Sequence, residues 1–149
     1  MLRPFLSLVV LFALSACGKK EAATATASEH HHSAPHGGTL VELGEHAYSL
    51  EFVRDSNAGT LTVYALDGHA ENFIRLSALA IQLVAMPGGK YTPISLKAVA
   101  NSATGETVGN TSQFEAQADW LKTAGEFAGI VTLEIKGTKF EQVPFVIAK

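Results

Sequence analysis

From Gly38 onward, short runs of alternating apolar and polar residues dominate the chain. The run TLTVYAL at 60–66 has the two-residue period of a half-buried β-strand. The segments DSNAG (55–59) and MPGGK (86–90) are rich in turn-forming residues, which is typical of hairpins. Further strand-like runs lie at 39–43, 46–53, 79–85, 92–100, 129–137 and 139–148. We therefore predict an all-β domain over residues 37–149, an antiparallel immunoglobulin-like β-sandwich, with a small barrel as the alternative.

Two features modify this pattern. Phe114, Ala118 and Leu121 follow one another at intervals of four and three residues, which predicts one short amphipathic helix over 114–124. Pro144 interrupts the last run. Because proline has no N–H for a central ladder, we expect this strand at an edge of the sheet or at a bulge.

The N-terminus has a different character. Arg3 is followed by the apolar run PFLSLVVLFALSA, which predicts a secretory signal peptide over residues 1–16 because the run is too short for a stop-transfer helix. The sequence LSAC at 14–17 resembles the lipobox of bacterial lipoproteins. This resemblance implies acylation of Cys17 and, with Gly18 next, a lipid anchor in the outer membrane facing the periplasm. The alternative is an ordinary secretory signal with a chance cysteine near its cleavage site.

Residues 17–36 have no aromatic or large aliphatic side chain, so we predict a lipidated, flexible tether. The whole chain has 11 Lys and Arg against 14 Asp and Glu, a formal net charge of −3, and no basic run. Nucleic acid is therefore not an expected partner. Cys17 is the single cysteine, which leaves the domain without a disulfide or a thiolate ligand.

Five of the six histidines lie between residues 30 and 46. His30, His31 and His32 fall in the predicted tether, where they either collect divalent metal ions or are simply solvated. His36 precedes two glycines that permit a tight turn before the first strand, so we expect the fold to fix its position.

Three more residues are weaker metal-ligand candidates. Glu51 is expected on the solvent side or rim of its strand, either as a second ligand beside His36 or as a solvated carboxylate. His46 is expected in the turn between the first two strands, roughly 15 Å from His36 over five residues of strand. His69 is expected in a loop, with Asp67 and Glu71 as nearby oxygen donors.

The segment PHGGTLVELGEHAYSLEFVRD (35–55) and the later SQFEAQADWLKTAGEFAGIVTLEIKGTKF (112–140) resemble a group of small uncharacterised bacterial lipoproteins. Their periplasmic domain begins with His-Gly-Gly. A related opening occurs in the N-terminal region of some heavy-metal efflux adaptor (membrane fusion) proteins. The resemblance implies a periplasmic, metal-binding domain. Ser49 departs from the pattern, since relatives often have a second histidine there.

No catalytic motif such as G-x-S-x-G, H-E-x-x-H or C-x-x-C is present, and we expect no enzymatic activity. Imidazole and carboxylate ligands suit Zn(II), Cu(II), Ni(II) or Co(II), and binding should weaken below about pH 6.5 as imidazole becomes protonated. The prediction is a lipoprotein that binds or buffers divalent transition metal ions, as an accessory to a metal efflux system. The alternative is a structural or protein-interaction lipoprotein of the envelope whose histidines are incidental.

Overall fold

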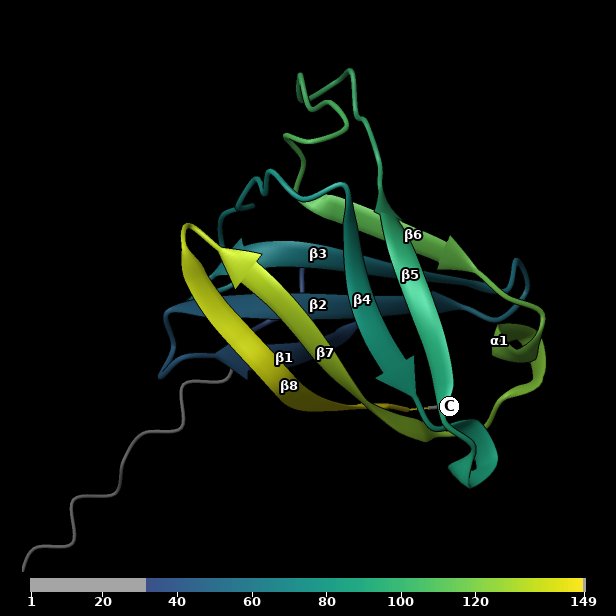
Figure 1. The fold of residues 1–149 in the computed structure, drawn as a ribbon. Helices are drawn as coiled ribbons and strands as arrows, with labels where there is room; N and C mark the ends of the chain where they lie inside the picture. The colour runs from purple at the N-terminus through teal and green to yellow at the C-terminus, as the bar shows by residue number, and fades with distance from the viewer. Residues whose placement is uncertain (1–31, 149) are drawn as a thin grey trace, which may run out of the picture. The chain divides into compact units, whose positions relative to one another are not determined.

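Eight antiparallel strands carry nearly all of the regular structure in the computed structural model, which describes residues 32–148 (Figure 1). This confirms the prediction of an all-β fold with one short helix. The elements are β1 (Thr39–Leu43), β2 (Tyr48–Asp55), β3 (Thr60–Asp67), β4 (Ala80–Ala85), the 3₁₀ turn η1 (Pro87–Gly89), β5 (Thr92–Ala98), β6 (Gln113–Gln117), α1 (Trp120–Thr123), β7 (Phe127–Ile135) and β8 (Thr138–Ile147).

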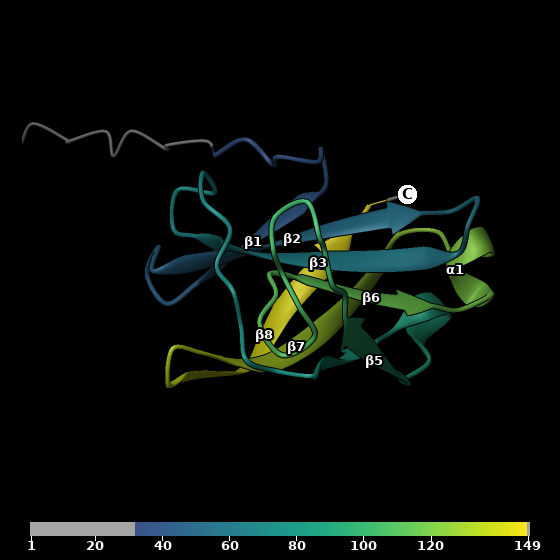
Figure 2. The ribbon, with the colours of Figure 1, turned by 90° about the horizontal axis from the view of Figure 1, so that it is seen from above.

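All eight strands belong to one hydrogen-bonded sheet in the order β1-β2-β3-β6-β5-β4-β7-β8. Its two halves are joined at the centre by a short ladder, where Lys97 pairs with Glu115 and Ala98 with Phe114. Seen from above, the halves form two layers that cross at an angle (Figure 2). The structure therefore has two layers, as predicted for a sandwich, but all eight strands belong to one continuous sheet, as expected for the barrel alternative. Pro144 lies in β8, an edge strand as predicted.

The hydrophobic core fills the space between the two layers. Phe52 of β2 stacks on Phe145 of β8 with ring centroids 4.6 Å apart, which ties one layer to the other. Every second residue of β2 and β3 points into this core, as the alternation of the sequence predicts. The fully buried members of the core include Leu50, Phe52, Leu61, Val63, Ala65, Leu96, Phe114, Leu121, Val131 and Ile135.

The outer face of β1, β2 and β3 carries a different set of side chains. Cross-strand pairing places Glu42 beside Ser49, and Glu51 beside Tyr64. Directly paired residues in an antiparallel sheet project on the same side. Ser49 and Glu51 are buried all the same, at 1% and 0% exposure. Other parts of the chain must therefore cover this face.

The helix predicted over 114–124 is only partly correct. Residues 113–117 form β6, which pairs with β3 from Thr60 to Tyr64, and only Trp120–Thr123 is helical. The two-residue alternation at the start of this segment has an open strand edge to pair with, and this tertiary pairing outweighs a weak helical period. Among residues 32–148, no helix has the length and apolar character needed to cross a membrane.

Glu106 anchors the long polar connection between β5 and β6. Its buried carboxylate accepts hydrogen bonds from the backbone N–H and hydroxyl of Ser112, at 3.0 and 2.8 Å, and from the hydroxyl of Thr104, at 3.0 Å. Burial alone would raise the pKa of Glu106. The hydrogen bonds from Ser112 and Thr104, together with the nearby Arg75 guanidinium, outweigh this effect and lower the pKa below its ordinary value.

This lowered pKa predicts an acid-sensitive contribution to stability. The contribution is present above the ordinary glutamate pKa of about 4.3 and is lost as the pH falls through the lower pKa of the folded state. Glu106→Gln should therefore be less stable than the wild type at neutral pH, and the difference should shrink below about pH 4. Urea unfolding between pH 3 and 7 measures this. A difference that stays constant with pH would contradict the assignment.

Candidate metal centre

The carboxylate of Glu51 is fully buried. It accepts hydrogen bonds from the backbone N–H of His36 at 2.7 Å, from Nδ1 of His36 at 2.8 Å and from the backbone N–H of Gly38 at 3.0 Å. Because an ionised carboxylate only accepts hydrogen bonds, Nδ1 of His36 carries the proton. Charge-assisted bonds of this kind are stronger than neutral ones. We call this arrangement of residues 36–38 on Glu51 the carboxylate latch.

The ring of His36 lies flat over the outer face of the sheet. It stacks on Tyr64, with centroids 4.0 Å apart and planes 14° apart, and it is tilted by 47° against Phe73, with centroids 5.7 Å apart. The side chain of His36 keeps 38% of its surface exposed while Glu51 has none. Burial, and then the negative charges of Glu51 and Glu115, raise the pKa of Tyr64. Tyr64 is therefore a neutral platform for the imidazole.

Position 38 of the latch has no room for a side chain. A Cβ at this position would collide with the carbonyl oxygen of Phe52 and crowd the side chains of Val53 and Glu51. The bare backbone can instead lie directly on β2, and its N–H reaches the carboxylate. The prediction that the fold fixes the position of His36 is confirmed, and the contacts with the sheet extend upstream of Gly37.

The expectation that Glu51 faces solvent or the sheet rim is wrong. Its strand face is opposite to the core, as predicted, but Glu51 is fully buried there and its carboxylate is bound by His36 and Gly38. Both carboxylate oxygens are used by the latch, so Glu51 acts on His36 as a hydrogen-bond partner. A carboxylate bound to one imidazole nitrogen is the usual support of a metal-binding histidine, and it leaves Nε2 of His36 outside the latch.

A second group of side chains lies at the β1–β2 turn. One nitrogen of His32, one nitrogen of His46 and one carboxylate oxygen of Glu42 all lie within 4.8 Å of one another. Glu42 also lies 3.2 Å from Nδ1 of His46. Imidazole and carboxylate form the ligand set that divalent transition metals accept. We call His32, Glu42 and His46 the three-ligand cluster.

The turn that carries His46 has an unusual backbone. Glu45 and His46 both have positive φ, at 50° and 66°. This left-handed conformation costs residues with a side chain about 1–2 kcal/mol each. Two hydrogen bonds from the N–H of Ala47, to Leu43 and Gly44, close the turn. His46 is thus a turn residue, as predicted, and β2 begins two residues later at Tyr48.

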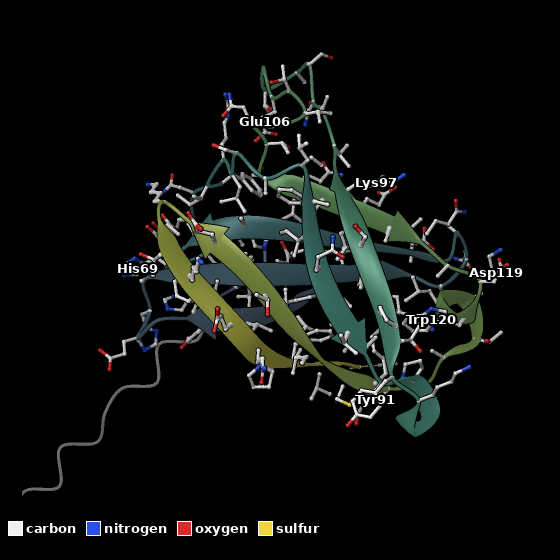
Figure 3. The ribbon with its side chains drawn as sticks, in the orientation of Figure 1. His69, Tyr91, Lys97, Glu106, Asp119 and Trp120 are labelled. Carbon is white, nitrogen blue, oxygen red and sulfur yellow. The ribbon has the colours of Figure 1, made fainter. Side chains whose placement is uncertain are left out.

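His69 lies in the loop after β3, also as predicted, and Figure 3 shows it at the end of the molecule opposite Asp119 and Trp120. The side chain of Asp67 is used inside this loop, where it accepts hydrogen bonds from Asn72 at 2.6 Å and from the N–H of Glu71 at 2.9 Å. These bonds, with that of the Asn72 side chain the strongest, lower the pKa of Asp67. These hydrogen bonds therefore hold the loop that carries His69 in a defined conformation.

His32 and His46 were predicted as ligands from the sequence, but their proximity to each other and the role of Glu42 were not. Glu42 is four residues before His46 and lies on the outer face of β1, which is a usable but weak signal. His36 is not part of the three-ligand cluster. His30, His31 and Cys17 lie outside the described residues, so the roles predicted for them stay predictions. A comparison with protein-family models, curated proteins and solved structures found no match for this chain.

The latch generates a stability prediction. In Glu51→Gln the amide oxygen can keep the two backbone N–H bonds, but the NH₂ group must face Nδ1 of His36. The imidazole then has to change tautomer, and all three bonds lose their charge assistance. We expect the free energy of unfolding to fall by about 1–3 kcal/mol, as measured by urea unfolding. The matched control is Glu115→Gln, an exposed carboxylate on the same outer face, which should change stability by no more than about 0.5 kcal/mol. Equal losses would contradict the latch.

Proposed function

We propose that this protein is a non-catalytic lipoprotein that captures and buffers divalent transition metal ions at the periplasmic side of the bacterial envelope. The observation that supports this best is the three-ligand cluster, in which two imidazoles and a carboxylate from separate parts of the chain lie within 4.8 Å of one another. Ligands at about 2.0–2.1 Å from a tetrahedral ion lie about 3.4 Å apart. Modest rotations of exposed side chains would therefore complete the site.

The chemistry of the cluster limits the ion. Nitrogen and oxygen donors favour Zn(II), Cu(II), Ni(II) or Co(II) over a soft ion such as Cu(I). His46 and Glu42 are 64% and 48% exposed, so an ion can reach them without opening the fold. Their mutual contact at 3.2 Å must be broken on binding, which favours moderate affinity and reversible exchange.

The carboxylate latch is proposed to serve this site indirectly. It fixes His36 and Gly38 on β2, and His32 is only four residues upstream. The latch thereby limits how far His32 can move from the β1–β2 turn, and so lowers the ordering cost of binding. His30 and His31 would raise the local concentration of ions near this entrance.

The location and the partner complete the proposal. Acylation of Cys17 would hold the domain at the outer membrane, because multiple acyl chains give stable anchoring. The segment predicted as a tether over residues 17–36 would join this anchor to the domain. The resemblance to efflux adaptors supports a role as an accessory that passes ions to a metal efflux system.

Metal titration tests the capture function. The described residues belong to one compact unit with its own core, so a chain starting at Gly18 keeps the cluster. We expect this chain to bind one Zn(II) in isothermal titration calorimetry, and His46→Ala to weaken binding by roughly tenfold or more, as the loss of a ligand requires.

The matched control separates the cluster from its His-rich neighbours. The double variant His30→Ala/His31→Ala should still bind one ion, whereas His32→Ala should behave like His46→Ala. If binding disappears with His30 and His31 alone, the tether is the metal-binding element and the cluster proposal fails. If no variant binds, the interaction role expected as the alternative is favoured.

The lipid anchor is tested separately. In a Gram-negative host, Cys17→Ser should move the full-length protein from the membrane fraction to the soluble periplasmic fraction or leave it with an uncleaved signal peptide. Metabolic labelling with a fatty acid should be lost in the same variant. Labelling that persists without Cys17 would refute acylation at this residue.

A further inference from the structure

We infer that His69 is the fourth ligand of the proposed metal site, which makes it a closed tetrahedral site of three imidazoles and one carboxylate suited to Zn(II). This inference rests on the proposed function and extends it to a specific ligand set. The first observation is that the ring of His32 lies edge-on against two other imidazoles. Its centroid is 6.3 Å from that of His46, at 68°, and only 5.6 Å from that of His69, at 89°.

The backbone brings His69 to the cluster through the residue before it. Gly68 is buried, and a Cβ there would collide with the carbonyl oxygen of His46. The loop after β3 thus packs directly on the β1–β2 turn, and this approach is possible only for glycine. The fold therefore places the loop that carries His69 against the turn that carries His46, while the His69 side chain itself is exposed.

A buried hydroxyl beside Glu42 supports the metal site on which the assignment of His69 depends. Ser49 is 1% exposed, and its Oγ has no hydrogen-bond partner among residues 32–148. Ser49 is the direct cross-strand partner of Glu42 on the outer face. A buried hydroxyl rarely stays unpaired, and metal-bound carboxylates are usually oriented by a second hydrogen bond. Ser49 is in the right place to orient Glu42 when that carboxylate turns toward an ion.

The ligand set selects the metal. Three neutral imidazoles and one carboxylate around a divalent ion give four hard-to-borderline donors and a net charge of +1. Four such donors arriving from four segments suit the tetrahedral geometry of Zn(II), which imposes no d-electron preference. Cu(II) and Ni(II) prefer tetragonal or square-planar arrangements of ligands. The strained turn that carries His46 and the separate loop that carries His69 are less able to place their ligands in one plane. Co(II) is therefore a suitable spectroscopic probe for Zn(II) in this site.

The experiment uses Co(II) with the chain starting at Gly18, which has no cysteine. We expect the intense visible absorption of four-coordinate Co(II) at one equivalent, and its displacement by Zn(II). His69→Ala should lose this intensity and weaken binding by roughly tenfold or more. His69→Cys should restore binding and add a thiolate-to-Co(II) charge-transfer band. Glu71→Cys, on the same loop and equally exposed, should bind like the wild type without that band.

The outcomes separate this inference from the proposal on which it rests. If the wild type does not bind Co(II) or Zn(II), the proposed function itself fails. If the wild type binds but His69→Ala keeps the same affinity and spectrum, or His69→Cys gives no charge-transfer band, the three-ligand cluster stands and His69 is not a ligand. Because His69 is exposed, urea unfolding of these variants should match the wild type, so lost binding cannot be ascribed to unfolding.

Discussion

The buried carboxylate of Glu51 is the constraint on which the N-terminal part of this domain depends. A carboxylate removed from water is strongly destabilising unless hydrogen bonds and charge replace its hydration. All three of the donors that reach Glu51 come from residues 36–38. This segment therefore cannot leave the sheet without exposing or stranding the charge. Glu51 of β2 thus fixes the position of residues 36–38, and it thereby limits where His32, four residues upstream, can lie.

The strands were predictable because short runs of apolar and polar residues that mostly alternate are separated by turn-forming residues. The predicted limits of β1 to β5, β7 and β8 agree with the observed ones to within a few residues. The segment at 113–117 was harder. The spacing of Phe114, Ala118 and Leu121 favours a helix, yet residues 113–117 alternate like a strand and pair with the edge of β3. The continuity of the sheet through two residue pairs of β5 and β6 is a long-range property of the same kind.

The site was only partly predictable as a set of residues, because Glu42 was not among the predicted ligands. The motif at 36–38 correctly indicated a histidine fixed by the fold, whereas Glu51 was expected to be an exposed second metal ligand or a solvated carboxylate. Their relationship is a hydrogen bond rather than an exposed pair, because alternation cannot tell an outer face open to water from one covered by the chain itself. The meeting of His32 with His46 depends on a left-handed turn and on a segment folding back over the sheet. Neither leaves a periodic signal in the sequence.

The separation of the latch from the three-ligand cluster bears on what kind of metal site this fold can support. Structural metal sites are usually closed and buried, and the fold depends on them. Here the fold already has a continuous core and a satisfied latch, so the energy of binding is not needed for folding. At the proposed site, which is half exposed at Glu42 and His46 and has one ligand on the entering segment, an ion would bind and leave without unfolding the sheet. That combination of a stable scaffold and a detachable ligand suits reversible capture and transfer better than permanent storage.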